Sequence, residues 1–329
     1  MTALSVPAGA TSRRIPRPSG LAWTVLRLHR TALIVWSVLV VGSAGALLWA
    51  CGPGADAARK ELARCGGLHH CDPTGPAYGT YETVSELGSA VIFAAPFLAA
   101  VWAGALAVGR ELESGTAALA WTQSVSPARW LAAKLALPAL ALTAGTTLLV
   151  LLHRLMWSTG GGELLGLRWY EDDAFQANGP IGVAYALCGL TFGALAGVAT
   201  RRTLHAPIGA VAALFFILGA GVRYGPSLWP ADTVTGAKAL QVTDTVQILE
   251  HGAVTADGRR IGNNWACVDS DSAADVHHCM KRTGLTEFWA TYHPSGHFWP
   301  LQLMESGAVL AVAALAVVAA FLLLRRRTA

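Results

Sequence analysis

The sequence has little charge. Asp, Glu, Lys and Arg make up 13% of the 329 residues, about half of the roughly 25% found in soluble globular domains. Hydrophobic residues make up 53% of the chain. This composition excludes an ordinary soluble enzyme, because such a domain keeps charged side chains on its surface. It favours a protein whose surface largely faces lipid.

Lysine is especially scarce, and none of the lysines follows a glycine. A phosphate-binding Walker loop requires Gly-Lys followed by Ser or Thr. The chain therefore lacks a P-loop of its own. We expect no ATPase activity in this chain, no other enzymatic activity and no cofactor bound by it.

Long charge-free stretches are abundant instead. Six of them reach the roughly 17 to 25 residues that a helix needs to cross a bilayer. They are Thr31–Ala50, Leu87–Gly109, Leu135–Leu152, Gly179–Thr200, Ala206–Val222 and Ser306–Leu324. We predict an all-α integral membrane protein with a disordered tail over residues 1–20 and a six-helix domain over residues 21–329, leaving little chain for a separate folded domain. Residues 21–30 suit either a short interfacial helix or a plain extension of the first span.

The positions of the basic residues predict the orientation of these spans. Short cytoplasmic loops are enriched in Lys and Arg. With six spans both termini lie on one side, which carries 13 of the 24 Lys and Arg residues but only two acidic ones, Glu111 and Glu113. We expect cytoplasmic termini and a large extracytoplasmic loop over residues 223–305. The net positive charge reflects this topology and predicts no nucleic-acid partner.

The overall composition also indicates a cellular location. Ala, Gly and Arg are abundant, which is typical of a bacterial gene of high GC content. A multi-pass protein from such a gene is expected in the bacterial plasma membrane, surrounded by the lipid bilayer.

Small residues recur at helical spacing within two spans. They are Gly189, Gly193 and Gly197 in the fourth span, and Ala95, Ala99, Ala103 and Ala107 in the second. Such stripes let helix backbones approach closely in lipid. We expect them to pack helices within one bundle rather than between subunits.

Four of the six cysteines fall in the predicted outer loops. The loop-local pairs Cys65–Cys71 and Cys267–Cys279 are the natural disulfides there, because an extracytoplasmic compartment permits oxidation, although four cysteines allow three pairings. The tracts His69-His70-Cys71 and His277-His278-Cys279 leave metal binding open as an alternative. Their spacing matches no standard zinc module, so we assign no metal ligands.

Two carboxylates occupy the outer ends of predicted spans. They are Glu86 and Glu305. A carboxylate hydrated at the interface costs little, and hydration is our expectation for both. A role in an exit gate is the alternative.

The most specific pattern lies between the second and third spans, over Gly109–Lys134. Two acidic residues and a Gly-Thr break precede an amphipathic run, and Ser126-Pro127 then caps another helix. A loop of this kind offers a docking surface to a soluble partner. Arg-x-x-Glu-x-Gly-Thr over residues 110–116, followed by Ser-x-x-Arg over residues 126–129 and then by a lysine, resembles the coupling loop of ABC-2-type transporter permeases.

This resemblance implies specific roles for six residues. Glu111, Glu113, Gly115 and Thr116 would belong to the element that contacts a separate P-loop ABC ATPase subunit, which binds the ATP. Arg129 and Lys134 would position the far end of that element. The long Cys- and His-bearing loop before the sixth span departs from many members of the family, which have only short helices there.

The resemblance also implies a function. The chain would be the permease subunit of a bacterial ABC transporter that exports an amphipathic, lipid-like or drug-like substrate. One six-helix subunit forms half of a pathway, so we expect a second permease subunit, most simply in a homodimer.

Two other classes of protein stay open. A membrane sensor or accessory protein would use its extracytoplasmic Cys and His residues to bind metal or to form disulfides. An intramembrane enzyme is disfavoured, because the predicted spans contain no paired carboxylates and no nucleophile–base pair.

Overall fold

The computed structural model describes residues 21–64, 75–123, 125–242, 245–262, 267 and 273–328. Within these ranges six helical segments are long and apolar enough to cross a membrane. They are His29–Ala63, Pro76–Glu113, Pro127–Leu164, Ile181–Thr200, His205–Leu228 and Ser295–Thr328. Each overlaps one of the six predicted spans, so the prediction of six membrane helices is confirmed.

The bundle contains helices of very different lengths. Its elements are α1 (Leu21–Trp49), η1 (Ala50–Gly54), α2 (Ala55–Ala63), α3 (Pro76–Val101), η2 (Trp102–Gly109), α4 (Arg110–Glu113), α5 (Thr116–Thr122), α6 (Pro127–Met156), η3 (Trp157–Gly161), α7 (Gly162–Leu164), α8 (Asp172–Ala177), α9 (Ile181–Thr200), α10 (His205–Tyr224), η4 (Gly225–Leu228), η6 (Ser295–His297) and α12 (Phe298–Thr328). The second and third spans have 38 residues each, about 57 Å of helix, against roughly 30 Å of hydrocarbon. They therefore extend well beyond the bilayer.

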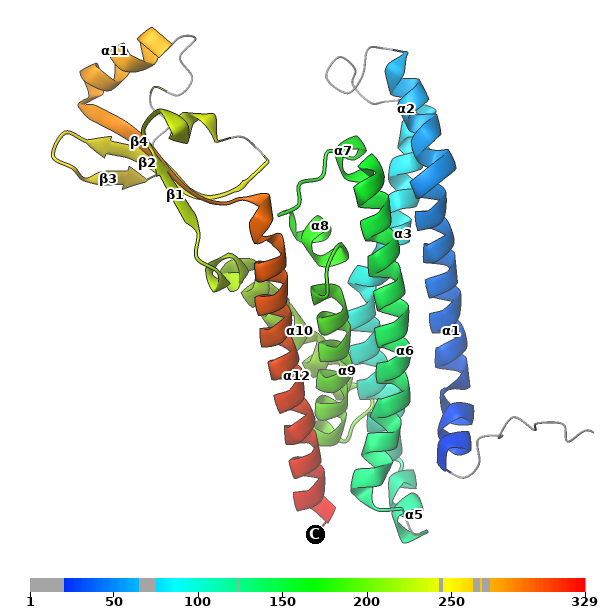
Figure 1. Cartoon of the computed structure of the whole chain (residues 1–329). Coiled ribbons are helices and arrows are strands. Elements are labelled where there is room, and N and C mark those ends of the chain that lie inside the picture. Colours follow the sequence, from blue (N-terminus) through cyan, green and yellow to red (C-terminus); the bar gives the residue numbers. More distant parts are fainter. Residues whose placement is uncertain are drawn as a thin grey trace, which may run out of the picture.

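The two ends of the bundle carry different structures (Figure 1). The start of α1, the short helix α5 and the end of α12 lie at one end, while α2, α7 and a small β-sheet lie at the other. Both described ends of the chain are thus on the same side, as an even number of spans requires. Residues 21–30 form the first part of α1, which agrees with a plain extension of the first span.

Helix α9 is the central helix and packs through its glycines. A Cβ atom at Gly189 would collide with the backbone of Pro96, and one at Gly193 with the backbone of Ala100. At Gly197 it would meet the Val108 side chain at 2.9 Å. The glycine stripe therefore packs α9 against α3 and η2 within one subunit, as predicted.

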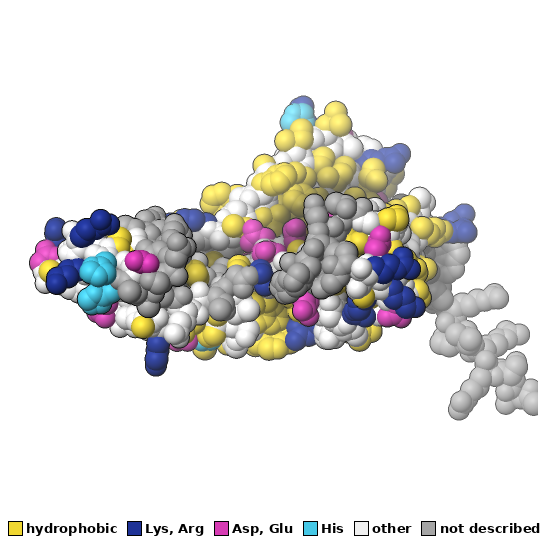
Figure 2. Space-filling view, turned by 90° about the horizontal axis from the view of Figure 1, so that it is seen from above, with side chains coloured by type: hydrophobic (Ala, Val, Ile, Leu, Met, Phe, Trp, Pro, Cys, Tyr) yellow, Lys and Arg dark blue, Asp and Glu magenta, His cyan; other side chains and the backbone are white. Residues whose placement is uncertain are grey.

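The surface of the bundle is apolar, as a lipid-facing surface must be. Large hydrophobic side chains are exposed on several helices. They include Val38 and Val41 on α1, Phe215 and Phe216 on α10, and Leu315 on α12. Many charged side chains are visible instead at the end that carries the sheet, as the view onto that end shows (Figure 2).

The prediction of an all-α protein is wrong between α10 and α12. There the strands β1 (Asp232–Thr235), β2 (Gln247–Thr255), β3 (Arg260–Gly262) and β4 (Leu285–His293) form an antiparallel sheet in the order β1-β4-β2-β3, with η5 (Gly236–Gln241) and α11 (Ala273–Thr283) between strands. The expectation that little chain was left for a folded unit is wrong for the same reason. β4 is rich in β-branched and aromatic residues, which suit strands, but strands of three to nine residues produce no long apolar run.

The sheet has its own small core and a disulfide. Ala253, Leu285 and Phe288 are buried together, and Met280 of α11 packs against them. A disulfide joins Cys267 to Cys279, 12 residues apart, as predicted. The other candidate pair, Cys65 and Cys71, lies outside the described residues.

Candidate functional site

The candidate site is the segment of residues 110–134, here called the coupling segment, at the bundle end that carries both described chain ends (Figure 1). Gly115 divides it, because its φ of +72° lies in the left-handed region that glycine adopts without strain. The turn ends α4 and lets α5 begin at Thr116. Ser126 then caps α6, its Oγ accepting a hydrogen bond from the backbone N of Arg129 at 3.4 Å, with Pro127 at the first helical position.

Glu111 holds the two ends of the coupling segment together. Its Oε1 lies 2.6 Å from the Lys134 Nζ, and its Oε2 accepts a hydrogen bond from the Trp130 Nε1 at 3.1 Å. The Lys134 side chain is only 4% exposed and its Nζ lies 5.3 Å from the centre of the Trp130 ring. A buried ammonium needs such a counter-ion, because desolvation penalises an unpaired charge. The carboxylate of Glu111 therefore has its partners inside this chain.

Glu113 reaches a different part of the chain. Its Oε2 accepts hydrogen bonds from the backbone N of Thr203 at 2.7 Å and from the Thr203 Oγ1 at 2.5 Å. Thr203 lies in the short connection between α9 and α10. No local pattern in the sequence points to this contact, because the two residues are 90 positions apart. The contact fixes the coupling segment to that connection.

The remaining predicted residues face outward. Gly115, Thr116 and Arg129 are exposed. Thr116 Oγ1 lies 2.9 Å from Ser114 Oγ, which stabilises the turn locally. In the described part of the chain the Arg129 guanidinium has no hydrogen-bond or ion-pair partner, so it stays available to solvent or to another molecule.

Helix α5 has one packed face and one free face. Ala117 is buried, and Trp121 packs edge-to-face on Trp130 with ring centroids 5.8 Å apart. On the opposite side Leu119 is 65% exposed, and Ala118 and Thr122 are exposed as well. A short helix that is anchored on the bundle and presents an apolar side chain is suited to docking.

A further contact joins α12 to α9 at the bundle end that carries α5. The Arg327 Nη1 donates hydrogen bonds to the carbonyl oxygens of Val198 at 2.7 Å and Ala199 at 2.9 Å. The end of α12 is thereby joined to the end of α9, which precedes the connection held by Glu113. The coupling segment, α9, α10 and α12 are therefore connected by polar contacts at one end of the bundle.

Comparison with protein families decides the class of the molecule. A family model described as ABC-2 membrane transporter related matches residues 33–224, more than half of the chain. The chain belongs to this family. No curated protein and no solved structure matches it.

Membership of the ABC-2 related family confirms the resemblance seen in the coupling segment. The match includes the first five spans and the whole coupling segment, and ends at Tyr224, before the sheet and α12. The family implies a multi-pass transporter permease, which is typically not an enzyme, and association with an ABC ATPase.

Carboxylates at the other end behave differently from one another. Glu305 is buried, and its Oε1 accepts a hydrogen bond from the Tyr185 hydroxyl at 2.7 Å, so hydration does not account for it. Glu86 is exposed and lines a cavity of about 290 Å³ together with Glu82 and Asp173. Asp172 lies in α8, outside the membrane spans. Burial and the charge of the neighbouring Asp173 raise the pKa of its carboxyl group.

One of the two tracts considered for metal binding lacks its free thiol. The sulfur of Cys279 is bonded to Cys267 in the disulfide. The other tract, His69-His70-Cys71, lies outside the described residues. Across the ranges that the structure describes, no three His, Cys, Asp or Glu side chains are grouped closely enough to hold a metal ion.

Proposed function

We propose that this chain is the permease subunit of an ABC exporter in a bacterial plasma membrane, and that α5 docks onto a separate ABC ATPase subunit. The single observation that carries the proposal is the construction of α5. Trp121 and the Glu111–Lys134–Trp130 contacts anchor the helix on the bundle, while Leu119 faces away from it. Family membership supplies the ATPase as the expected partner.

The contacts around α5 support a route for transmitting ATP-driven movement. A displacement of α5 would reach α6 through Lys134, because a buried ion pair resists separation. It would reach the α9–α10 connection through Glu113 and Thr203. The long helices would then carry the movement across the membrane.

Two observations support cytoplasmic termini. The end that carries α5 has most of the short-loop Lys and Arg residues, in agreement with the charge bias of cytoplasmic loops. The Cys267–Cys279 disulfide lies in the sheet at the opposite end, as expected of an oxidising extracytoplasmic compartment.

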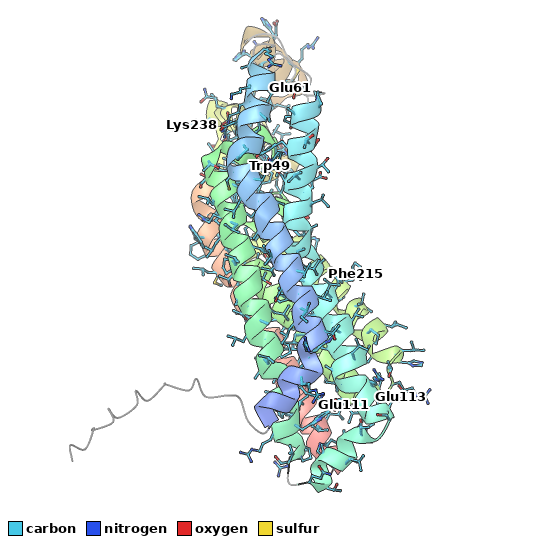
Figure 3. All side chains as sticks on the ribbon, turned by 90° about the vertical axis from the view of Figure 1, so that its right-hand side faces the viewer. Trp49, Glu61, Glu111, Glu113, Phe215 and Lys238 are labelled. Carbon is cyan, nitrogen blue, oxygen red and sulfur yellow. A yellow bond between two sulfur atoms is a disulfide. The ribbon has the colours of Figure 1, made fainter. Side chains whose placement is uncertain are left out.

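A second permease subunit, most simply an identical one, would complete the pathway. Helix α10 supports this part of the proposal, because Phe215 and Phe216 are both exposed on it. Figure 3 places Phe215 on the outer side of the bundle. An aromatic pair of this kind can pack against a partner helix. The uncharged spans suit an amphipathic, lipid-like or drug-like cargo, and the family is associated with outward transport.

The test is co-purification with a matched pair of variants. The tagged chain is solubilised gently from its native host, and the proteins that accompany it are identified by mass spectrometry. We expect an ABC ATPase with the unaltered chain and with Leu204→Asp, and none with Leu119→Asp. Leu204 is the control because it is also an exposed leucine and lies outside α5, in the connection between α9 and α10.

Two results would contradict different parts of the proposal. Absence of any ATPase from the unaltered chain, under conditions that preserve dimers, would reject the permease function. Equal recovery of the ATPase with both variants would reject α5 as its docking element.

A further inference from the structure

An apolar cavity opens between α1, α3 with η2, and α6, away from the coupling segment's outer surface. Its volume is about 460 Å³, within the range of roughly 300–1,000 Å³ that small-molecule sites occupy. The apolar wall includes Val35, Trp36, Leu39, Leu98, Leu106 and Leu142. Figure 3 looks onto α1, with α3 on one side of it and α6 on the other.

One end of the cavity is polar. His29 lines it and is only 3% exposed, and the ring packs edge-on against Trp102 with centroids 4.9 Å apart. Among the residues that the structure describes, none makes a hydrogen bond with the His29 Nε2. A buried polar atom without a partner is costly, so a ligand that supplies the missing hydrogen bond would be favoured.

A positive charge lies at the same end. Arg110 lines the cavity and is exposed, and its guanidinium forms no ion pair within the described ranges. The adjacent carboxylate of Glu111 is occupied by Lys134 and Trp130. The mouth of the cavity therefore presents an available cation beside an unpaired histidine nitrogen.

We propose that this cavity binds an amphiphile with an acyl chain and an acidic head group. The head group accepts hydrogen bonds from the Arg110 guanidinium, whose planar fork suits carboxylate and phosphate oxygens, and from the His29 Nε2 in the ring tautomer that carries its hydrogen there. The chain lies along α1 between the leucines of α3 and α6. The position of the two polar groups agrees with this. His29 lies in the first part of α1 and Arg110 begins α4, and both of these segments are at the α5 end of the bundle. The apolar wall extends from there toward the membrane centre.

The identification of this amphiphile as cargo rests on the proposed function, whereas its binding does not. The experiment therefore uses the purified full chain in neutral detergent, without ATPase or ATP. A sixteen-carbon fatty acid with a diazirine in its chain is photo-cross-linked to the protein, and the labelled peptides are mapped by mass spectrometry. The matched probe is the corresponding alcohol, which has the same chain and no charge.

We expect the acid to label residues 29–39 and 98–110, and the alcohol to label them at least about tenfold less, the effect of losing a hydrogen bond between charged partners. Arg110→Gln should abolish this preference for the acid. His29→Phe keeps a ring against Trp102 and should reduce the preference. Arg326→Gln, at an exposed arginine of α12, should leave it unchanged.

A pair of tryptophan substitutions tests the cavity itself. Val35→Trp fills it and should prevent labelling, whereas Val38→Trp, at another exposed position of α1 that does not line the cavity, should not. Unlabelled palmitate and phosphatidylglycerol are then compared as competitors. Stronger competition by palmitate identifies a single-chain acid, and stronger competition by phosphatidylglycerol identifies a bilayer lipid.

The proposal is overturned by equal labelling with acid and alcohol, by failure of both competitors, or by equal effects of the two tryptophan variants. Each of these results concerns binding to the purified chain alone, so it does not depend on whether an ATPase co-purifies. A chain that retains its ATPase but does not bind the acid would keep the proposed function and lose this site.

Discussion

The α5 end of the bundle and the sheet are stabilised in different ways. At the end that carries α5, polar side chains join parts of the chain that are 23, 90 and 129 residues apart. The sheet instead pairs strands that all lie between residues 232 and 293, and its disulfide spans 12 residues. The first arrangement links several helices, whereas the second stabilises a local unit. A force applied to α5 would therefore be shared among helices, while a change in the sheet should stay within it.

The largest expected effect comes from removing the Glu111 carboxylate. Glu111→Ala leaves Lys134 buried without its counter-ion, which should lower the free energy of unfolding by about 3–5 kcal/mol. Thermal unfolding of the detergent-solubilised chain measures this loss. Glu111→Leu combined with Lys134→Met should recover most of it, because the unpaired charge is then gone.

Glu86→Ala is the control at the opposite end. Glu86 is exposed, and substitutions at exposed positions usually change stability by less than about 0.5 kcal/mol. Equal losses for Glu111→Ala and Glu86→Ala would show that the Glu111–Lys134 pair does not stabilise the α5 end.

Removing the disulfide should produce a smaller and more local loss. Cys267→Ser with Cys279→Ser relaxes the unfolded sheet region, at a cost of roughly 3 kcal/mol for a loop of this size. We expect faster proteolysis between residues 245 and 293 and unchanged recovery of the ATPase. Loss of the ATPase together with the disulfide would show that the sheet is not a local unit.

The sequence was informative where a physical signal was local. The apolar runs predicted the six spans, and the spacing of Gly189, Gly193 and Gly197 predicted their packing, because each depends on neighbouring residues of one helix. The turn at Gly115 and the cap at Ser126 were visible for the same reason. Contacts between distant positions, such as Glu113 with Thr203, leave no comparable pattern in a single sequence.

The errors have equally physical causes. The sheet was missed because its strands are short and half polar, so that their hydrophobicity never resembles a membrane span. Glu305 was expected in water because its position marks the edge of an apolar run, but the structure pairs it with Tyr185 of another helix. The burial of His29 could not be predicted from residues 21–30, because it depends on Trp102 from a different span.

The central helix provides the next smaller test. Gly189→Ala places a methyl group against the Pro96 backbone, and overpacking of this kind costs about 1–3 kcal/mol. Gly209→Ala in α10 is the matched control, because a Cβ atom there meets nothing within 4 Å. Thermal unfolding of the two variants should show a lower melting temperature for Gly189→Ala than for Gly209→Ala. If Gly209→Ala destabilises the chain as much as Gly189→Ala, close packing at α9 is not the reason for its glycines.

The smallest effect on stability, and the most specific effect on function, is expected for Thr203→Val. The substitution removes the hydroxyl that donates to Glu113 and keeps the backbone hydrogen bond and the side-chain shape. Because the Glu113–Thr203 contact is exposed, unfolding should change little. The ATPase should still co-purify, since Leu119 is untouched, but ATP hydrolysis in reconstituted vesicles should drive less transport per ATP. Thr83→Val, which removes an exposed hydroxyl that bonds to Gly79 of its own helix, should leave that ratio unchanged. Equal ratios in both variants would show that movement of α5 reaches the long helices through Lys134 and α6 without the connection to α10.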